Sequence, residues 1–246
     1  MSVLLFLFLQ FELLPDLNEF LEITKAGLVE QLDEEEVLEG YTYRRRTIRD
    51  NEVKEHDIFQ FDMGLYTRLI SENGVSAREQ DLEKQDSGPP FVPKSEKDRR
   101  AMIDDMFRVW SFQLVGRDSV RGRTALVIAF EPRKDAKPQT RSGKWFFRNS
   151  KGVAWVDERD HRIVRMHTTV IKDISFAWGL FGKVHKGTEI LREWRKVNDE
   201  VWLPSMSLKR FHARAFMVGL SFQEIEQYFD YRKFDGETKL QLGSPK

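Results

Sequence analysis

Histidines and carboxylates are the side chains of this sequence with the most obvious chemistry, because the chain contains no cysteine. Without thiols there can be no disulfide, no thiolate nucleophile and no thiolate metal site. The histidines are His56, His161, His167, His185 and His212. No two of them are four residues apart, the spacing at which one helix face binds zinc. The sequence therefore predicts no metal site.

Catalytic motifs are also missing. The sequence has no G-x-S-x-G elbow, no Walker loop and no G-x-G-x-x-G, so acyl transfer and nucleotide chemistry lack their usual markers. The carboxylate pairs Asp104-Asp105 and Asp157 with Asp160 are of a kind that is ordinarily solvated. A hydrolase using two carboxylates from separate strands stays open as a remote alternative. We expect no enzyme and no catalytic residue.

Charge is unevenly placed along the chain. Residues 1–40 hold ten acids and one base, Lys25, whereas residues 41–246 hold thirty acids and thirty-nine bases. Such an excess could attract anionic head groups or nucleic acid. Acids lie within a few residues of the clusters Arg44-Arg45-Arg46 and Arg121-Gly122-Arg123. We interpret both clusters as solvated strand faces and expect no nucleic-acid partner.

The amino-terminal part reads as an apolar leader followed by an acidic helix, over residues 1–38. The run Ser2 to Leu9 has the length of a signal-peptide apolar region and is too short to span a bilayer, but no basic region precedes it. A cleaved signal and a buried first helix both stay open. Between Phe11 and Leu38 the apolar residues recur at helical spacing, which predicts one or two helices.

From residue 39 to residue 246 the pattern predicts a single β domain of about ten antiparallel strands with one inserted helix. Short runs of β-branched and aromatic residues alternate with turn residues. We expect Lys144 to Arg148 to be one of the strands and Gly116-Arg117-Asp118 to be one of the turns. A capping box at Ser95 and Asp98 begins a helix at about 96–110. Three prolines within 87–93 require a loop before it.

Aromatic side chains are the most informative feature, since a sheet with one aromatic face must cover it. The interpretation from pattern alone is a closed core. The alternative is a partly filled cavity in which the helix near 96–110 acts as a lid over an apolar ligand, with methionines that adapt to varied shapes. The side chains that would line such a cavity are Phe59, Phe61, Met102, Ile103, Met106, Phe107, Trp110, Trp145, Phe147 and Trp155.

The turns and strand ends of the β region form a recognisable set over about residues 39–234. They are Tyr41 to Arg45, Gly116 with Gly122-Arg123-Thr124, Phe130-Glu131-Pro132, Gly152 to Asp157, Lys186-Gly187-Thr188, Leu203-Pro204 and Tyr228 to Phe234. Together these segments resemble those of outer-membrane lipoprotein-sorting (LolA/LolB-like) proteins of diderm bacteria. The resemblance implies a half-barrel, an incomplete antiparallel barrel around helices, with no cofactor. These signatures carry no ligand-contact motif.

The resemblance also implies a function. A protein of this kind would lie in the periplasm and shelter the acyl chains of a lipid or lipoprotein in its concave face, in transient contact with membranes during sorting to the outer membrane. Acyl chains leave a bilayer only for a surface that is equally apolar, at about 0.8 kcal/mol per CH₂. The alternative is an envelope sensor or assembly factor on the same fold, which binds a protein partner.

Overall fold

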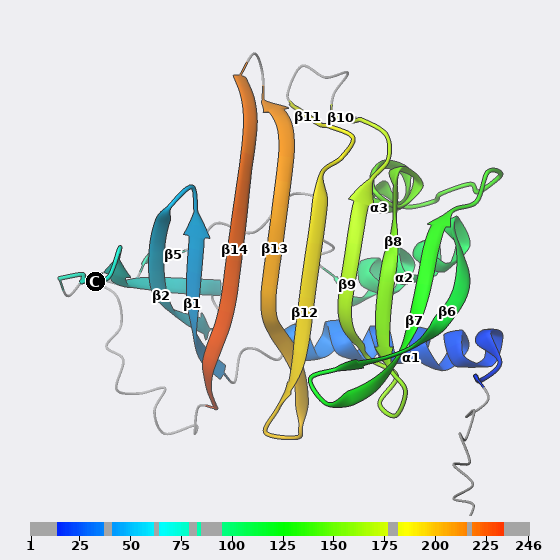
Figure 1. Ribbon diagram of the computed structural model, residues 1–246, viewed down its shortest axis with the longest axis horizontal. Coiled ribbons are helices and arrows are strands. Elements are labelled where there is room, and N and C mark those ends of the chain that lie inside the picture. The colour runs from blue at the N-terminus through cyan, green and yellow to red at the C-terminus, as the bar shows by residue number, and fades with distance from the viewer. Residues whose placement is uncertain are drawn as a thin grey trace, which may run out of the picture.

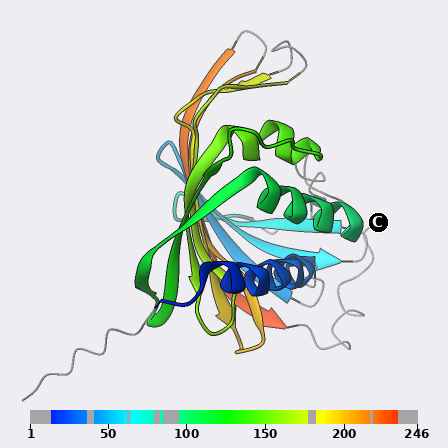
Figure 2. The same cartoon turned by 90° about the vertical axis from the view of Figure 1, so that its right-hand side faces the viewer.

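The computed structural model describes residues 14–36, 41–61, 64–78, 83–84, 95–176, 182–215 and 218–233. The predicted leader up to residue 13 and the proline-rich loop at 87–93 lie outside these ranges. Within them, one large antiparallel sheet curves around three α-helices that lie on its concave side (Figures 1 and 2). No helix of the described residues is long and apolar enough to cross a membrane.

The sheet has fourteen strands in the described residues, and ten of them are eight or more residues long. Along the sheet the main order is β4-β3-β2-β1-β14-β13-β12-β9-β8-β7-β6, and its two ends are not joined. This is the open, mainly β half-barrel that the sequence predicts. The strands are β1 (Tyr41–Arg49), β2 (Glu52–Phe61), β3 (Gly64–Glu72), β4 (Val75–Ser76), β5 (Glu83–Lys84), β6 (Trp110–Val120), β7 (Arg123–Pro132), β8 (Ser150–Asp157), β9 (Ile163–Val170), β10 (Ile174–Phe176), β11 (Gly182–Val184), β12 (Glu189–Val197), β13 (Val201–Ala215) and β14 (Val218–Lys233).

Two-residue turns connect several of the long strands. Asp50-Asn51 and Asn73-Gly74 both have positive φ, as hairpin turns of the primed types require. The turn predicted at Gly116-Arg117-Asp118 is wrong. Strand β6 continues through it to Val120 with a bulge between Leu114 and Gly116, and the chain reverses at Arg121-Gly122, where φ is 53° and 78°. Gly116 lies at a bulge. Glycine is common both at bulges and in turns, so its presence alone did not distinguish the two.

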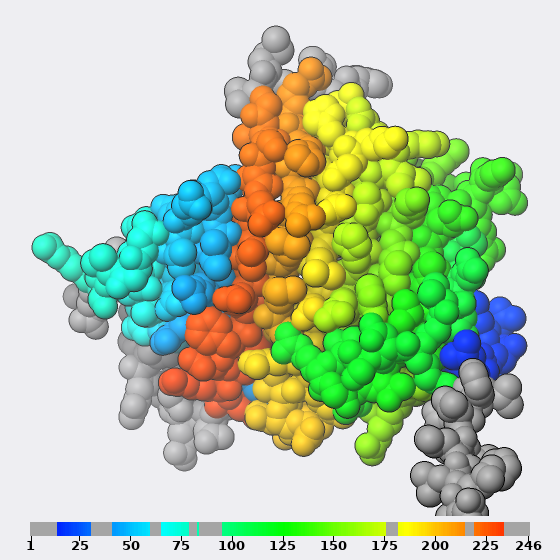
Figure 3. Space-filling view, viewed as in Figure 1, coloured from blue at the N-terminus to red at the C-terminus, as the bar shows by residue number. Residues whose placement is uncertain are grey.

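The β6–β7 hairpin is long enough for its tip to fold over the convex side of the sheet. Arg121 at the tip donates to Glu193 of β12 (3.0 Å) and to Ser205 of β13 (3.1 Å). Figure 3 shows the atoms of this hairpin covering the lower part of the neighbouring strands.

Three α-helices occupy the concave side. α1 (Leu17–Glu36) is one continuous helix, and α2 (Glu96–Val109) begins at the predicted cap, where Ser95 Oγ accepts from the backbone N–H of Asp98 (3.1 Å). α3 (Arg141–Trp145) and a 3₁₀ turn (Phe147–Asn149) connect β7 to β8.

The strand predicted for Lys144 to Arg148 is therefore wrong, because this segment is helical. Thr140 Oγ1 accepts from the backbone N–H of Gly143 (2.9 Å) and so begins the helix. The aromatic alternation of Trp145 and Phe147 is compatible with a strand. The helix forms because Thr140 caps it and because residues 139–140 are held by tertiary contacts. Further along the chain, β13 is continuous from Val201 to Ala215 through Pro204.

The main core lies between the helices and strands β6 to β9, and it extends to β12 and β13. Its buried side chains include residues from all layers, namely Phe20, Leu28, Ile103, Val109, Trp110, Leu126, Ile128, Phe130, Phe147, Val156, Trp194 and Trp202.

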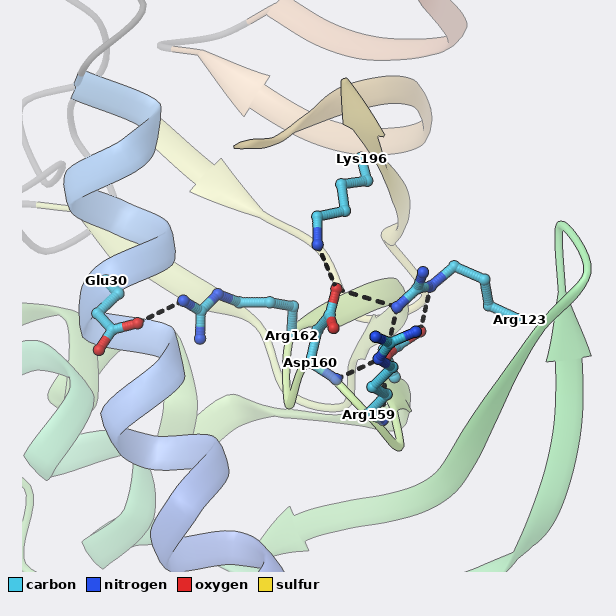
Figure 4. A network of polar contacts seen from close by, with 7 residues as sticks. Glu30, Arg123, Arg159, Asp160, Arg162 and Lys196 are labelled. Carbon is cyan, nitrogen blue, oxygen red and sulfur yellow. Dashed lines mark hydrogen bonds and ion pairs between the residues drawn. The ribbon is translucent and has the colours of Figure 1, made fainter. Parts of the chain in front are cut away.

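A polar network fastens the end of the sheet below this core (Figure 4). Arg123 donates to Asp157 (2.6 and 2.9 Å) and pairs with Asp160 (2.9 Å), which also accepts from Lys196 (2.9 Å). Asp157 is 1% exposed, so the expectation that these acids are solvated is wrong for it. An arginine from a neighbouring strand supplies the pairing that permits its burial.

Candidate functional site

The concave face of the sheet is amphipathic. One row of residues crosses it from strand to strand, each paired with the next: Ile128, Ala154, Met166, Arg192, Ser207, Glu226, Thr47 and Lys54. The first three pack into the core beneath the helices. Partners in register point to the same face of a sheet, so the polar residues that follow share this face. The row changes from apolar to polar at β12.

The apolar half is a packed interior organised around Trp110. Its indole ring stacks on Phe130, with ring centroids 4.1 Å apart, and meets Phe147 edge-on at 4.9 Å. The indole Nε1 donates to the carbonyl oxygen of Phe147 (2.8 Å), which satisfies the one polar atom of this side chain. Ile103, Trp110 and Phe147 are all at least 94% buried. The structure places these three predicted ligand contacts in the core.

Three other predicted ligand contacts lie at the margin of this core. Met102, Met106 and Phe107 are partly buried side chains of α2 that pack against it. Phe107 contacts Phe112 of β6 with ring centroids 5.1 Å apart, and the ammonium group of Lys25 lies 5.8 Å from the centroid of Phe107. These side chains therefore offer apolar surface that the fold has not fully covered.

The carboxyl-terminal half of helix α2 is fastened to the connection between β7 and α3. The carboxylate of Asp105, which is 0% exposed, accepts from the backbone N–H groups of Gln139 and Thr140 and from Thr140 Oγ1 (2.7 Å). It also pairs with Arg108 (3.2 Å). The expectation that Asp104-Asp105 is a solvated pair is wrong for Asp105. If α2 moves as a lid, the movement is confined to its first turns.

The polar half of the concave face carries a charged cluster, which we define as Arg45, His56, Lys209, Glu224, Glu226 and Tyr228. Lys209 Nζ donates to Glu224 (2.8 Å) and to Glu226 (2.7 Å), and Tyr228 Oη donates to Glu226 (3.1 Å). Arg45 pairs in register with His56 on one side and with Tyr228 on the other. The cluster thus spans four adjacent strands, β13, β14, β1 and β2.

Protonation in the charged cluster follows from burial and from these partners. Burial alone would raise the pKa of Glu226, but the hydrogen bond and charge of Lys209 hold this pKa below its ordinary value. Burial, and after it the charge of Glu226, raises the pKa of Tyr228, so the phenol stays protonated. Burial and the neighbouring charge of Arg45 lower the pKa of His56. Glu226 is held ionised, which is the opposite of what a general acid needs.

Three buried polar atoms of this face have no hydrogen-bond partner among the described residues: Arg45 Nε, His56 Nδ1 and Ser207 Oγ. Buried polar groups are usually paired, so unpaired ones on a concave face are suited to contact with a polar ligand group. The described residues contain no group of three histidines and acids that could hold a metal ion.

The remaining predicted contacts are not gathered with the α2 side chains. Phe59 is buried on β2, where its neighbours in register are Thr42 and Tyr66. Phe61 ends β2, and its side chain lies outside the described residues. Trp145 lies on α3, with the guanidinium of Arg141 5.0 Å from its ring.

Trp155 alternates along β8 with the core residues Ala154 and Val156 and so faces the convex side. There it donates to Asp118 (2.9 Å) and lines an open groove of about 480 Å³ with Arg165, Leu191 and Leu208.

Comparisons with known proteins give matches among solved structures alone. No protein-family model and no curated protein matches the chain. A putative outer membrane lipoprotein-sorting protein domain from Vibrio parahaemolyticus is 11% identical, with 86% of this chain and 92% of that chain covered and a TM-score of 0.38. A LolA superfamily protein from Nitrosomonas europaea is 9% identical, with 86% and 95% covered and a TM-score of 0.33.

A third match is the MucA/MucB complex of Pseudomonas aeruginosa, at 11% identity, with 85% and 99% covered and a TM-score of 0.26. The first two matches carry the family description that the sequence resembles. All three TM-scores lie below 0.5. The open half-barrel follows from the strand order of this chain, in which β4 and β6 lie at separate ends of the sheet.

Proposed function

We propose that this protein is a non-catalytic binding protein of the bacterial periplasm that holds an acylated amphiphile, a lipid or a lipoprotein, on the concave face of its half-barrel. The change from apolar to polar side chains along one row of the sheet is the observation that supports this proposal. A ligand with an apolar and a polar end matches such a face better than a purely apolar one does. Sorting of lipoproteins to the outer membrane is the process that would use it.

The acyl chains would lie against the partly exposed side chains of α2, Met102, Met106 and Phe107, and against the first turns of that helix. Thioethers and a phenyl ring supply apolar surface that adapts to flexible chains. The buried residues Ile103, Trp110 and Phe147 would support this surface from below, and they would contact a ligand only if the core opened. Phe59, Phe61, Trp145 and Trp155 have no part in this assignment.

The polar end of the ligand would lie on the charged cluster. Arg45 Nε is a donor without a partner in the described part of the chain, and His56 Nδ1 donates in the tautomer that carries its proton there, so a carboxylate, phosphate or peptide carbonyl could accept from them. Glu224 and Glu226 are already engaged by Lys209, which leaves the free donors as the recognition groups.

A titration with a diacylated lipopeptide, compared with the same peptide without acyl chains, tests this proposal. We expect the double variant Met102→Gln/Phe107→Gln to weaken lipopeptide binding by about 100-fold, at roughly tenfold per lost apolar contact. Val115→Gln is the matched control, because Val115 is 61% exposed on β6. Equal binding by the control and by the double variant would contradict the proposal.

A protein partner is the second candidate, and the unpaired donors of the charged cluster favour it. A segment of a partner chain could accept from Arg45 and His56 through its backbone or its acids. In the same titration, this candidate predicts that the peptide without acyl chains binds as tightly as the lipopeptide. Binding would then be lost in Arg45→Gln and unchanged in Met102→Gln/Phe107→Gln.

A further inference from the structure

The connection between β7 and β8 is strongly basic. Residues 133–151 contain seven bases and one acid, Asp135, a formal charge of +6. All seven bases are exposed, and none forms an ion pair with an acid of the described residues. They are Arg133, Lys134, Lys137, Arg141, Lys144, Arg148 and Lys151. Unpaired charge of one sign on one connection creates a positive local field, although the formal net charge of the whole chain is zero.

This connection also has a fixed place in the fold. Its ends are the paired strands β7 and β8, where Phe130 lies opposite Gly152. Asn149 accepts from the backbone N–H of Ile171, which brings the exposed Lys172 beside the same end of the sheet. Figure 2 shows α3 as the uppermost of the three helices on the concave side. The bases therefore lie together at one end of strands β7, β8 and β9.

Two aromatic side chains lie among these bases, and their backbone is already satisfied. Trp145 and Phe146 are partly exposed at the end of α3. Asn149 Nδ2 donates to the carbonyl of Trp145 (2.8 Å), and Ser150 Oγ donates to the carbonyl of Phe146 (2.9 Å). A surface that loses water at a bilayer must leave no backbone group unpaired, and these two carbonyls meet that condition.

We propose that residues 133–151 form a docking surface for bilayers rich in anionic lipids, with the bases at the head-group phosphates and Trp145 and Phe146 at the level of the head groups. Basic residues beside tryptophan are the combination that interfacial segments use. Nucleic acid is the other polyanion to consider. A nucleobase needs an open aromatic face for stacking, and Arg141 lies 5.0 Å from the Trp145 ring, over one of its faces.

Co-sedimentation with vesicles tests this surface in the full-length protein. The vesicles contain phosphatidylglycerol and phosphatidylcholine in equal parts, or phosphatidylcholine alone. Each base near an anionic surface contributes a factor of about five, so Lys137→Gln/Lys144→Gln/Arg148→Gln should bind anionic vesicles about 100-fold more weakly. Arg46→Gln/Arg78→Gln/Lys97→Gln removes the same charge from exposed positions on other elements and should bind within about fivefold of the original protein.

Quenching of tryptophan fluorescence by brominated anionic lipid gives a second readout. In a Trp155→Phe/Trp178→Phe background, we expect Trp145→Phe to remove most of the quenching, because the three remaining tryptophans, Trp110, Trp194 and Trp202, are buried. Four results would each overturn the proposal. The two triple variants could lose affinity for anionic vesicles equally, or the original protein could bind neutral vesicles as tightly as anionic ones. Quenching could be unchanged in Trp145→Phe, or the protein could bind polyuridylic acid and no vesicles.

Docking at this surface is independent of what the concave face holds. The triple variant of residues 137, 144 and 148 should keep its affinity for the lipopeptide in solution. Conversely, a protein that binds no lipopeptide would still bind anionic vesicles through this surface, so failure of either proposal can be told from failure of the other.

Discussion

Replacement of Asp105 by asparagine removes the charge that fastens α2 to the connection before α3. The carboxylate, which has no exposed surface, accepts from two backbone N–H groups and one hydroxyl and pairs with Arg108, whose side chain is exposed. Hydrogen bonds to a charged group contribute about 1.5–3 kcal/mol each, and an asparagine would turn an NH₂ group toward donors. We expect Asp105→Asn to lower the free energy of unfolding by about 3 kcal/mol.

Asp104→Asn is the matched control, since Asp104 is 55% exposed and pairs with Lys25 on α1. Its effect should stay below about 1 kcal/mol. Urea unfolding followed by tryptophan fluorescence measures both variants. Effects of equal size for Asp104→Asn and Asp105→Asn would refute the reasoning, because they would mean that the buried hydrogen bonds contribute nothing.

The same carboxylate predicts a pH dependence. Burial alone would raise the pKa of Asp105, but hydrogen bonds from Gln139 and Thr140 and the charge of Arg108 hold it below its ordinary value. A lowered pKa in the folded state contributes stability above the unfolded pKa of about 3.9, and this contribution is lost as the pH falls through the folded value. The difference in stability between Asp105→Asn and the original protein should therefore shrink below about pH 4.

Two further substitutions test the two halves of the concave face. Trp110→Phe removes the hydrogen bond to Phe147 and leaves a void, so it should cost about 2 kcal/mol in urea unfolding, and a cost near zero would contradict the packed core. Lys209→Met leaves Glu224 and Glu226 without their shared cation, so the pKa of Glu226 should rise in carbon-detected NMR titrations. Because the folded pKa would then exceed the unfolded one, this variant should gain stability as the pH falls, and the opposite slope would refute the pairing.

Strand alternation and turn residues in the sequence were enough to predict a mainly antiparallel β domain of about ten strands. The helix capped by Ser95 follows from the capping box, and the open half-barrel was implied by the family resemblance. α3 could not be predicted in this way. Aromatic and other side chains alternate over residues 144–148, as they do in a strand. The helix depends on Asp105, which lies more than thirty residues away in the sequence.

The candidate site was harder to predict than the fold. The helical periodicity of α2 predicts that Met102, Met106 and Phe107 lie on its apolar face. Whether Ile103 and Trp110 line a cavity or fill a core depends on tertiary packing, which sequence periodicity does not determine. The charged cluster was missed. Charges occur on both faces of β13 and β14, so alternation alone does not tell the concave face from the convex one.

Native mass spectrometry of the protein, purified without detergent from a diderm bacterium and followed by organic extraction, tests the central claim most directly. The account predicts a bound acylated species on the original protein and on Val115→Gln, and its loss from Met102→Gln/Phe107→Gln. An unliganded mass for the original protein, with no uptake of added diacylated lipopeptide, would contradict it.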